Sequence, residues 1–324
     1  MVTGASAGVG RAVAHAFARR GAHLGLIARG REGLEAAREE CEALGGEALV
    51  LPADVADAAA VDAAATAIEA RFGPLDVWVN DAMATVFASF LHTTAEEYRR
   101  ATEVTYLGTV HGTMAALQRM VPRDRGTVVQ VGSALAYRAI PLQSAYCGAK
   151  FAIRGMTDSV RTELLHHRSR VWITMVQLPA VNTPQFGWCR SRLPLHPQPV
   201  PPIFQPEVPA ETIYQAAHRR RREVVCGGSA LTAILGGIVA PGVADRYLAR
   251  TGFDSQQVPD VPVAPDRPDN LFAPLPALAA THGIFDRRSH RRSLQAWATV
   301  HRRALAGAAA ATVAAVTAVA SRLG

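Results

Sequence analysis

Two residues four positions apart, Tyr146 and Lys150, carry the strongest chemical signal in the sequence. Lys150 is the only lysine among 34 lysine and arginine residues, and a lysine amine can be tuned in pKa where a guanidinium cannot. Residues at i and i+4 share one face of a helix, so the ammonium is expected beside the phenol. There it should lower the pKa of Tyr146 from about 10 toward neutrality, which suits proton exchange with a carbonyl or an alcohol. Ser133, at the end of an apolar run, is expected to hydrogen-bond the substrate oxygen.

A glycine-rich turn opens the chain between a short apolar run and a helix-period stretch. Glycines let the backbone approach a pyrophosphate closely, and a helix N-terminus supplies amide donors. Tight turns need glycine in any protein, so the position of this one before a helix is what favours nucleotide binding. The residues assigned to the turn are Thr3, Gly4, Ser6, Gly8, Val9 and Gly10.

The second apolar run, His23–Ala28, ends without the carboxylate that typically grips the ribose of NAD. Arg29 stands there instead, and a guanidinium pairs well with a 2′-phosphate, so NADP(H) is expected over NAD(H). Arg11 either adds to this positive field or lies on the solvated surface. Asp54, followed by Val55 in the same predicted site, either accepts from the adenine amino group or caps a helix.

Apolar runs alternate with helix-period stretches up to about residue 226, which predicts an α/β fold. We expect a Rossmann-type, doubly wound parallel sheet in three α/β/α layers, as a single catalytic domain with a C-terminal tail. Only Met1–Thr3 precede the glycine turn, although this strand should be central, so we expect a truncated start; a short strand that tolerates the loss is the alternative. The predicted strands are His23–Ala28, Ala48–Pro52, Leu75–Asn80, Thr127–Gly132, Val171–Leu178 and Arg222–Cys226, and the predicted helices are Val9–Arg20, Arg31–Leu44, Asp57–Phe72, Ala95–Met120, Ser144–His166 and Ala230–Val239.

The glycine turn, Asn80-Asp81-Ala82, Ser133 and Tyr146-x-x-x-Lys150 resemble, in this order and spacing, the classical short-chain dehydrogenase/reductase family. The resemblance covers residues 1 to about 240. It implies that Ser133 polarises a carbonyl oxygen, that Tyr146 is the general acid/base, and that Lys150 tunes Tyr146 and holds the nicotinamide ribose, while the cofactor supplies hydride. It also implies a homo-oligomer, and cofactor contacts from Asn80 on the adenosine side, Pro179, and Thr183 at the nicotinamide amide.

Three departures from the family pattern keep an inactive relative open as an alternative. Asp81 and Met83 replace an asparagine and a glycine in the usual Asn-Asn-Ala-Gly. Thr105 stands where the family usually has the asparagine of a proton relay, so it is assigned to the catalytic set with a weaker or rerouted relay. Ala180 follows Pro179 where a glycine is usual.

The prolines of residues 179–209 exclude a helix or a central strand there and favour a substrate loop within the domain of residues 1–250. Its apolar residues favour a lipophilic carbonyl substrate, or simply pack the loop down. Residues 251–303 form a Pro/Arg-rich extension, of which 253–293 should be loosely packed. The apolar loop residues are Phe186, Trp188, Leu193, Ile203 and Phe204.

The net charge of +7 resides in the tail, where seven arginines and no acid follow residue 286. A neutral body argues against nucleic-acid binding. The alanine-rich stretch 304–321 is either a short membrane anchor or a helix packed on the enzyme or on a partner subunit. Peripheral attachment to a membrane surface through residues 287–324 is an intermediate possibility. The four cysteines lie far apart in the sequence, so we expect no metal site and reduced thiols. Together with the lack of a signal peptide, this favours a cytoplasmic protein, and tethering to the cytoplasmic face of a membrane stays open.

These observations favour an NADP(H)-dependent oxidoreductase that interconverts a hydrophobic ketone or aldehyde and its alcohol. The alternative is a catalytically weak cofactor-binding or scaffold protein on the same fold, attached to a membrane by its tail.

Overall fold

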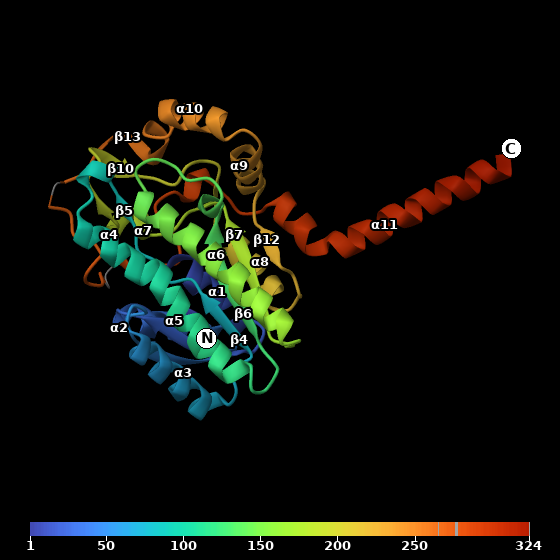
Figure 1. Cartoon of the computed structure of the whole chain (residues 1–324), viewed down its shortest axis with the longest axis horizontal. Helices are drawn as coiled ribbons and strands as arrows, with labels where there is room; N and C mark the ends of the chain where they lie inside the picture. Colours follow the sequence, from blue (N-terminus) through green and yellow to red (C-terminus); the bar gives the residue numbers. More distant parts are fainter. Residues whose placement is uncertain (265, 276–277, 324) are drawn as a thin grey trace.

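The structure, a computed structural model, describes residues 1–264, 266–275 and 278–323. A seven-stranded sheet with the order β12-β7-β6-β4-β1-β2-β3 forms its centre (Figure 1). Every neighbouring pair in this sheet is parallel, which confirms the predicted topology. The strands are β1 (Val2–Thr3), β2 (His23–Ala28), β3 (Glu47–Pro52), β4 (Val77–Asn80), β6 (Thr127–Ser133), β7 (Trp172–Leu178) and β12 (Glu223–Val225).

Helices cover both faces of the sheet and give the predicted three layers, because each crossover between parallel strands carries a helix. Two separate hydrophobic clusters fill the spaces between the helices and the two faces. One face carries α1 (Gly8–Ala18), α2 (Arg31–Ala43) and α8 (Glu207–Ala217), and the other carries α3 (Ala58–Phe72), α5 (Gly108–Met120) and α6 (Ser144–His166).

The predicted helix Ala95–Met120 is one continuous rod with a local change of winding. It begins as α4 (Ala95–Thr102), passes through the π-helical turn η2 (Glu103–Leu107) and continues as α5. Thr94 caps its start in a capping box with Glu97. π-turns of this kind are frequent at functional sites, and this one carries Thr105.

Only two residues form β1, yet the strand lies in the centre of the sheet, as expected. Val2 pairs with Leu26 on one side and Val79 on the other. The Met1 amino group donates to the Val77 carbonyl at 2.9 Å, and burial lowers the pKa of this amine to about 5. The expectation of a truncated start stays a prediction.

The proline-rich loop consists of irregular chain and very short strands, as its composition predicts. These are β8 (Ala180–Val181), β9 (Arg190–Ser191), β10 (Leu195–Pro197) and β11 (Ile203–Phe204), with the helical turn α7 (Gln185–Trp188). Leu193 and Ile203 pack in a cluster with Phe87 and Phe285. Of the two alternatives for the apolar loop residues, packing of the loop against the domain therefore holds for Leu193 and Ile203.

The prediction that residues 253–293 pack loosely is wrong. β13 (Gln257–Pro262) pairs antiparallel with β10, and β14 (Ser289–His290) pairs parallel with β11. Leu271 is fully buried and Phe285 is 5% exposed. The segment inserts single apolar side chains into the domain at irregular intervals, so its burial leaves no helical or strand period in the sequence.

Two consecutive helices follow β12 and stand above the carboxyl edge of the sheet (Figure 1). The predicted helix 230–239 is α9 (Gly228–Val239), and α10 (Pro241–Thr251) follows it at once. No prediction covered α10, none of whose residues is buried.

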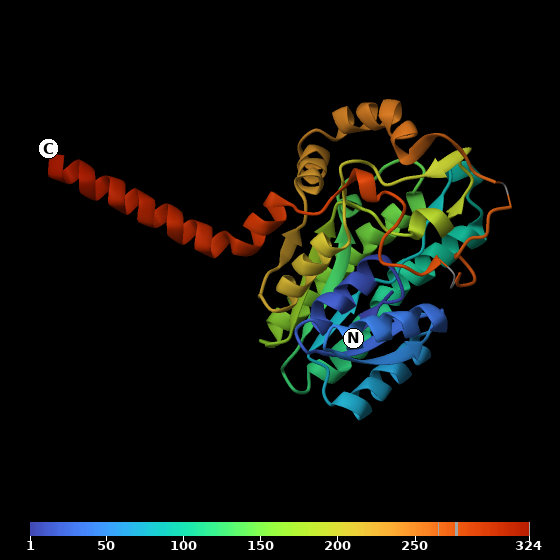
Figure 2. The same cartoon turned by 180° about the vertical axis from the view of Figure 1, so that it is seen from behind.

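The last helix, α11 (Leu294–Leu323), is attached to the domain by its first turns and then projects away from it (Figures 1 and 2). Ala296 is buried, the Gly227 amide donates to Gln295, and Arg221 donates to the Thr299 carbonyl. Among the residues that the structure describes, none of the helices combines the length and hydropathy that crossing a membrane requires.

The packing of the extension predicts a measurable contribution to stability. Phe285→Ala should lower the free energy of unfolding by about 3–5 kcal/mol, because it empties a buried aromatic site. Ile284→Ala is the matched control: that side chain is 75% exposed, so its loss should change stability by less than about 0.5 kcal/mol. Urea denaturation of both variants measures this, and equal midpoints would contradict the packed extension.

Candidate active site

A cavity of about 640 Å³ opens at the carboxyl edge of the sheet, where the loops after β1, β2, β3, β4, β6 and β7 converge. In a doubly wound sheet this edge is the expected ligand site, because the crossovers diverge there. Most of the predicted site residues line the cavity. They are Gly4, Ser6, Gly8, Val9, Arg29, Asp54, Val55, Ser133, Tyr146, Lys150, Pro179 and Thr183.

The glycine turn has the backbone geometry that its sequence predicts. Gly4 and Gly8 have φ values of 72° and 55°, in the left-handed region that favours glycine. A Cβ on Gly10 would lie 2.3 Å from the Gly4 carbonyl oxygen, so only glycine lets the turn close on itself. The first turn of α1 therefore directs backbone amides toward the cavity wall.

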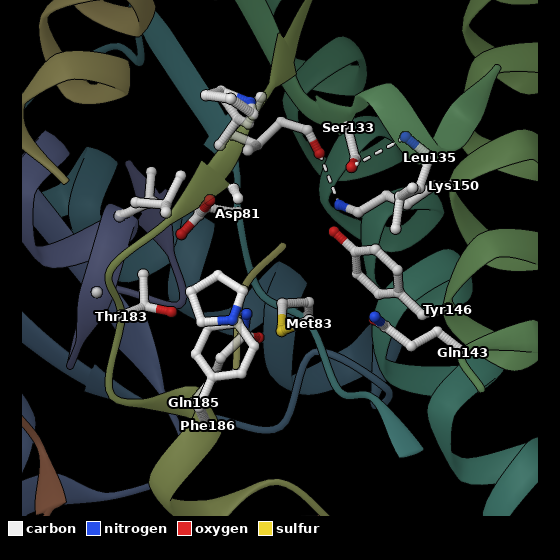
Figure 3. A pocket seen from close by; sticks show the side chains of 18 of the residues that line it. Asp81, Met83, Ser133, Leu135, Gln143, Tyr146, Lys150, Thr183, Gln185 and Phe186 are labelled. Atoms are coloured by element: carbon white, nitrogen blue, oxygen red, sulfur yellow. Dashed lines mark hydrogen bonds between the residues drawn. The ribbon is translucent and has the colours of Figure 1, made fainter. Parts of the chain in front are cut away.

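Three side chains from two elements converge inside the cavity (Figure 3). Tyr146 and Lys150 lie one turn apart on α6, and Ser133 ends β6. The Lys150 ammonium donates to the Val131 carbonyl at 2.7 Å and lies 5.5 Å from the centre of the Tyr146 ring. Ser133 Oγ accepts from the Leu135 amide at 3.1 Å, and the Ser133 hydroxyl is also a hydrogen-bond partner of Tyr146.

The prediction that Lys150 brings the pKa of Tyr146 toward neutrality is wrong for this structure. Burial raises the pKa of the Tyr146 phenol above its usual value, a hydrogen bond from Ser133 opposes the rise, and Cys147 and Asp81 add to it. Burial also lowers the pKa of the Lys150 amine, which weakens the positive charge that should favour phenolate.

Asp81, which the sequence marked only as a departure from the family pattern, brings a carboxyl group into the cavity. Burial raises the pKa of this carboxyl, while Lys150 and the Gly10 amide lower it. In return, the Asp81 charge raises the pKa of Lys150 and so supports its ammonium. Figure 3 shows Asp81 on the side of the cavity opposite α6. The sequence signal that could have identified Asp81 as a site residue is its position in the family pattern, where an asparagine is usual.

Asn80 does not line the cavity, which corrects the expectation of an adenosine contact. Its amide nitrogen donates to Gln130 and Thr113, and its oxygen accepts from the Trp78 indole at 2.8 Å. This buried network joins β4 to β6 and α5. Asn80 therefore holds the strand from which the Asp81 loop departs.

Thr3, Gly10 and Thr105 also lie behind the cavity wall. Thr3 Oγ1 accepts from the amides of Asp81 and Ala82 at 3.0 and 3.1 Å. Thr105 Oγ1 accepts from the Ala84 amide and donates to the Ala84 carbonyl, both at 2.9 Å. Because both bonds are internal, Thr105 fixes the loop after β4 and offers no hydroxyl to a proton relay.

The predicted adenosine end is crowded with guanidinium groups. Arg29 donates to the backbone carbonyls of Asn270 and Leu271. Burial lowers the pKa of its guanidinium, and the nearby positive charge of Arg100 lowers it further. Asp54 pairs with Arg100 through one oxygen and accepts from the Ala56 amide through the other. Neither oxygen of Asp54 is therefore without a partner in the protein itself.

Arg11 follows neither of its two expected roles. It is 4% exposed and pairs with Glu40 at 2.7 Å, and it donates to the carbonyls of Ser6 and Ala279. It therefore ties α1 to α2 and to the C-terminal extension.

The residues present fit a nicotinamide dinucleotide. The buried hydroxyl of Thr183 lines the cavity and has no hydrogen-bond partner in the protein, as expected for a group reserved for a ligand amide. A Cβ on Gly8 would lie 3.0 Å from Thr183, so a side chain there would narrow the space beside the turn.

The far end of the cavity is mostly apolar and is enclosed by α9, α10 and the substrate loop. Phe186 and Trp188 of the loop line it, unlike Leu193, Ile203 and Phe204. No sequence pattern indicated that α10 contributes to this end of the cavity. The other apolar residues at this end include Leu135, Ile140, Val200, Ala233, Tyr247 and Leu248.

A family model described as short chain dehydrogenase matches residues 1–191. The chain belongs to this family. The uncharacterized oxidoreductase YxnA of Bacillus subtilis is 30% identical over 295 residues, which cover 90% of this chain and 80% of that protein. A fatty acyl-CoA reductase of Acinetobacter baylyi is 28% identical over 257 residues, covering 78% and 83%. A metagenomic short-chain oxidoreductase solved in complex with NADP aligns at a TM-score of 0.58 and 28% identity, covering 69% of this chain and 94% of that one.

The Asp81 carboxylate predicts a shifted pH profile. Asp81→Asn restores the residue of the family pattern and removes the charge that supports the Lys150 ammonium, so the pKa of Lys150 should fall. The alkaline limb of kcat/KM should then move to lower pH. Asp62→Asn, which breaks only a surface pair with Arg119, is the control and should leave the profile unchanged. A limb that stays in place or moves to higher pH would contradict the role given to Asp81.

Proposed function

We propose that the protein is an NADP(H)-dependent oxidoreductase that interconverts a hydrophobic ketone or aldehyde and its alcohol. The observation that carries this proposal is the convergence of Ser133, Tyr146 and Lys150 in one cavity that also contains the glycine turn. Family membership supports the reaction class. When bound, the nicotinamide cofactor supplies or accepts the hydride.

Proton transfer falls to Tyr146. During reduction its hydroxyl donates a proton to the carbonyl oxygen, and during oxidation the phenolate takes the proton back. Ser133 donates a hydrogen bond to the same oxygen and so stabilises the charge that develops on it. The Lys150 ammonium, 5.5 Å from the centre of the Tyr146 ring, attracts the phenolate that remains, although burial outweighs this attraction in setting the pKa of the phenol.

The preference for NADP(H) rests on the predicted adenosine end. Arg29 lines the cavity where β2 ends and no carboxylate follows it directly in sequence. A guanidinium attracts a 2′-phosphate, whereas it gives no advantage to a free ribose hydroxyl. The solved relative that binds NADP supports the same assignment.

The hydrophobic substrate class rests on the apolar end of the cavity. Leu135, Ile140 and Phe186 line the same cavity as Tyr146, and residues of α9 and α10 extend the apolar lining. Removing an apolar chain from water there stabilises the complex by about 25 cal/mol for each Å² of apolar area buried. The fatty acyl-CoA reductase among the relatives supports a lipophilic aldehyde or ketone.

Tyr146→Phe tests the proton-transfer role. The variant should lose at least about 100-fold in kcat, because it removes the general acid. Its dissociation constant for NADPH should stay within about twofold, since the phenol makes no charged contact with a phosphate. Tyr106→Phe makes the same change outside the cavity and is the control. Turnover of a panel of lipophilic ketones and aldehydes is measured, and a Tyr146→Phe variant as active as Tyr106→Phe would contradict the mechanism.

Arg29→Ala tests the cofactor preference. The dissociation constant for NADPH should rise about 10- to 100-fold through the lost charge-assisted hydrogen bond, while that for NADH should change much less. Arg31→Ala, an exposed arginine two residues further on, is the control. Fluorescence titration with both cofactors measures this. An equal loss for NADPH and NADH would mean that Arg29 acts only through the extension and not on the phosphate.

A further inference from the structure

The C-terminal extension runs along the whole cofactor side of the cavity. We call residues 270–275 and 278–283, the described part of this segment, the strap. Its first residues lie at Arg29, its middle at the glycine turn, and its end at Thr183. These are the predicted adenosine end, the pyrophosphate position and the nicotinamide end.

At the predicted adenosine end, two guanidinium groups hold one carbonyl of the strap. Arg29 and Arg100 both donate to the Leu271 carbonyl at 3.2 Å. The Leu271 side chain is fully buried in the cluster below, so it anchors the strap to the domain. A Cβ on Gly30 would meet Pro274 at 3.4 Å, which places the strap in contact with the end of β2.

Over the glycine turn, the strap bonds to the backbone of the first helix. The Gly8 amide donates to the Ala280 carbonyl at 2.9 Å, and Arg11 donates to the Ala279 carbonyl at 3.1 Å. A Cβ on Gly33 would lie 2.7 Å from the Ala279 Cβ, so the close approach of strap and α2 requires glycine there.

At the nicotinamide end, the strap touches the chain on either side of Thr183. The Gly283 amide donates to the Asn182 carbonyl at 3.2 Å, and a Cβ on Gly283 would lie 2.4 Å from the Thr183 carbonyl oxygen. Phe285, two residues further on, is buried and fixes this end as Leu271 fixes the other.

The strap forms a wall of the cavity and does not fill it. Asn270, Pro274, Leu275 and Ala279 line the same space as the glycine turn and Arg29. The sequence of the segment contains no aspartate or glutamate, so it sets no carboxylate against a pyrophosphate. The Ala280 carbonyl accepts from the Gly8 amide at 2.9 Å, so the strap takes this one donor of the turn.

We propose that the strap is the outer wall of the cofactor site and that it slows release of the bound cofactor. The inference rests on the proposed function, because it needs a dinucleotide in the cavity. Since the strap is anchored at Leu271 and Phe285 and bonded to the turn between them, the cofactor leaves only when one anchor opens. Cofactor exchange is thereby coupled to local opening of the extension.

Leu271→Ala in the full chain weakens one anchor without altering a residue that lines the cavity. The rate at which NADPH dissociates, measured by stopped-flow fluorescence with excess NADP⁺ as the trap, should rise at least about tenfold because strap opening becomes easier. Ile284→Ala is the control: this residue lies outside the strap, its side chain is 75% exposed and it does not line the cavity, so its rate should equal that of the wild type. Leu271→Met keeps the volume and should restore most of the slow release.

The outcomes separate the two proposals. A folded Leu271→Ala protein that releases NADPH at the wild-type rate overturns the strap but leaves the function intact. Faster and tighter binding by this variant also overturns it, since the strap would then be an obstruction. A wild-type chain that binds neither NADPH nor NADH contradicts the proposed function itself.

Hydrogen exchange of the wild-type chain tests the inference without a variant, and so does not depend on whether Leu271→Ala folds. Peptides that cover the strap should exchange more slowly with saturating NADP⁺ than without it, because the bound cofactor holds the wall closed. Peptides from the exposed surface of α3 are the internal reference. Strap peptides whose exchange is unchanged by NADP⁺ would overturn the proposal.

Discussion

The burial of the Lys150 ammonium is the constraint on which the candidate active site depends. Taking an ammonium out of water costs several kcal/mol unless other groups compensate it. Here the Val131 carbonyl accepts from it at 2.7 Å, and the Asp81 carboxylate supplies an opposite charge. Val131 lies in β6 and Asp81 follows the neighbouring strand β4. The register of these strands and the position of the first turns of α6 must therefore match for the buried charge to be tolerated.

The departures from the family pattern form one connected arrangement around that constraint. Met83 replaces a flexible glycine, and the loop after β4 is instead pinned by hydroxyl groups on both sides. Thr3 holds the amides of Asp81 and Ala82, and Thr105 holds the amide and carbonyl of Ala84. A loop fixed at these points can hold a buried carboxylate in place, so the departures are compatible with a formed active site and do not indicate a decayed one.

The sheet and the convergence of Ser133, Tyr146 and Lys150 could be predicted because their signals are local. Alternation of apolar runs and helical stretches predicts the parallel order, and the spacing of Tyr146 and Lys150 places both on one face of α6. Burial could not be predicted in the same way. It raises the pKa of Tyr146, places Arg11 in an internal ion pair, and leaves Asn80 behind the wall, and each outcome depends on chain segments distant in sequence.

The extension was the least predictable part for the same physical reason. Leu271 and Phe285 each stand next to an apolar residue that is exposed, Phe272 and Ile284, so no helical or strand period marks the buried member of either pair. Each of the two buried side chains packs in a hydrophobic cluster of the domain. The substrate loop and the extension are also joined through their backbones, since β11 pairs with β8 on one side and with β14 on the other. The extension and the predicted substrate loop therefore share one small sheet, so a displacement of the extension at β14 would disturb the chain that leads into Thr183.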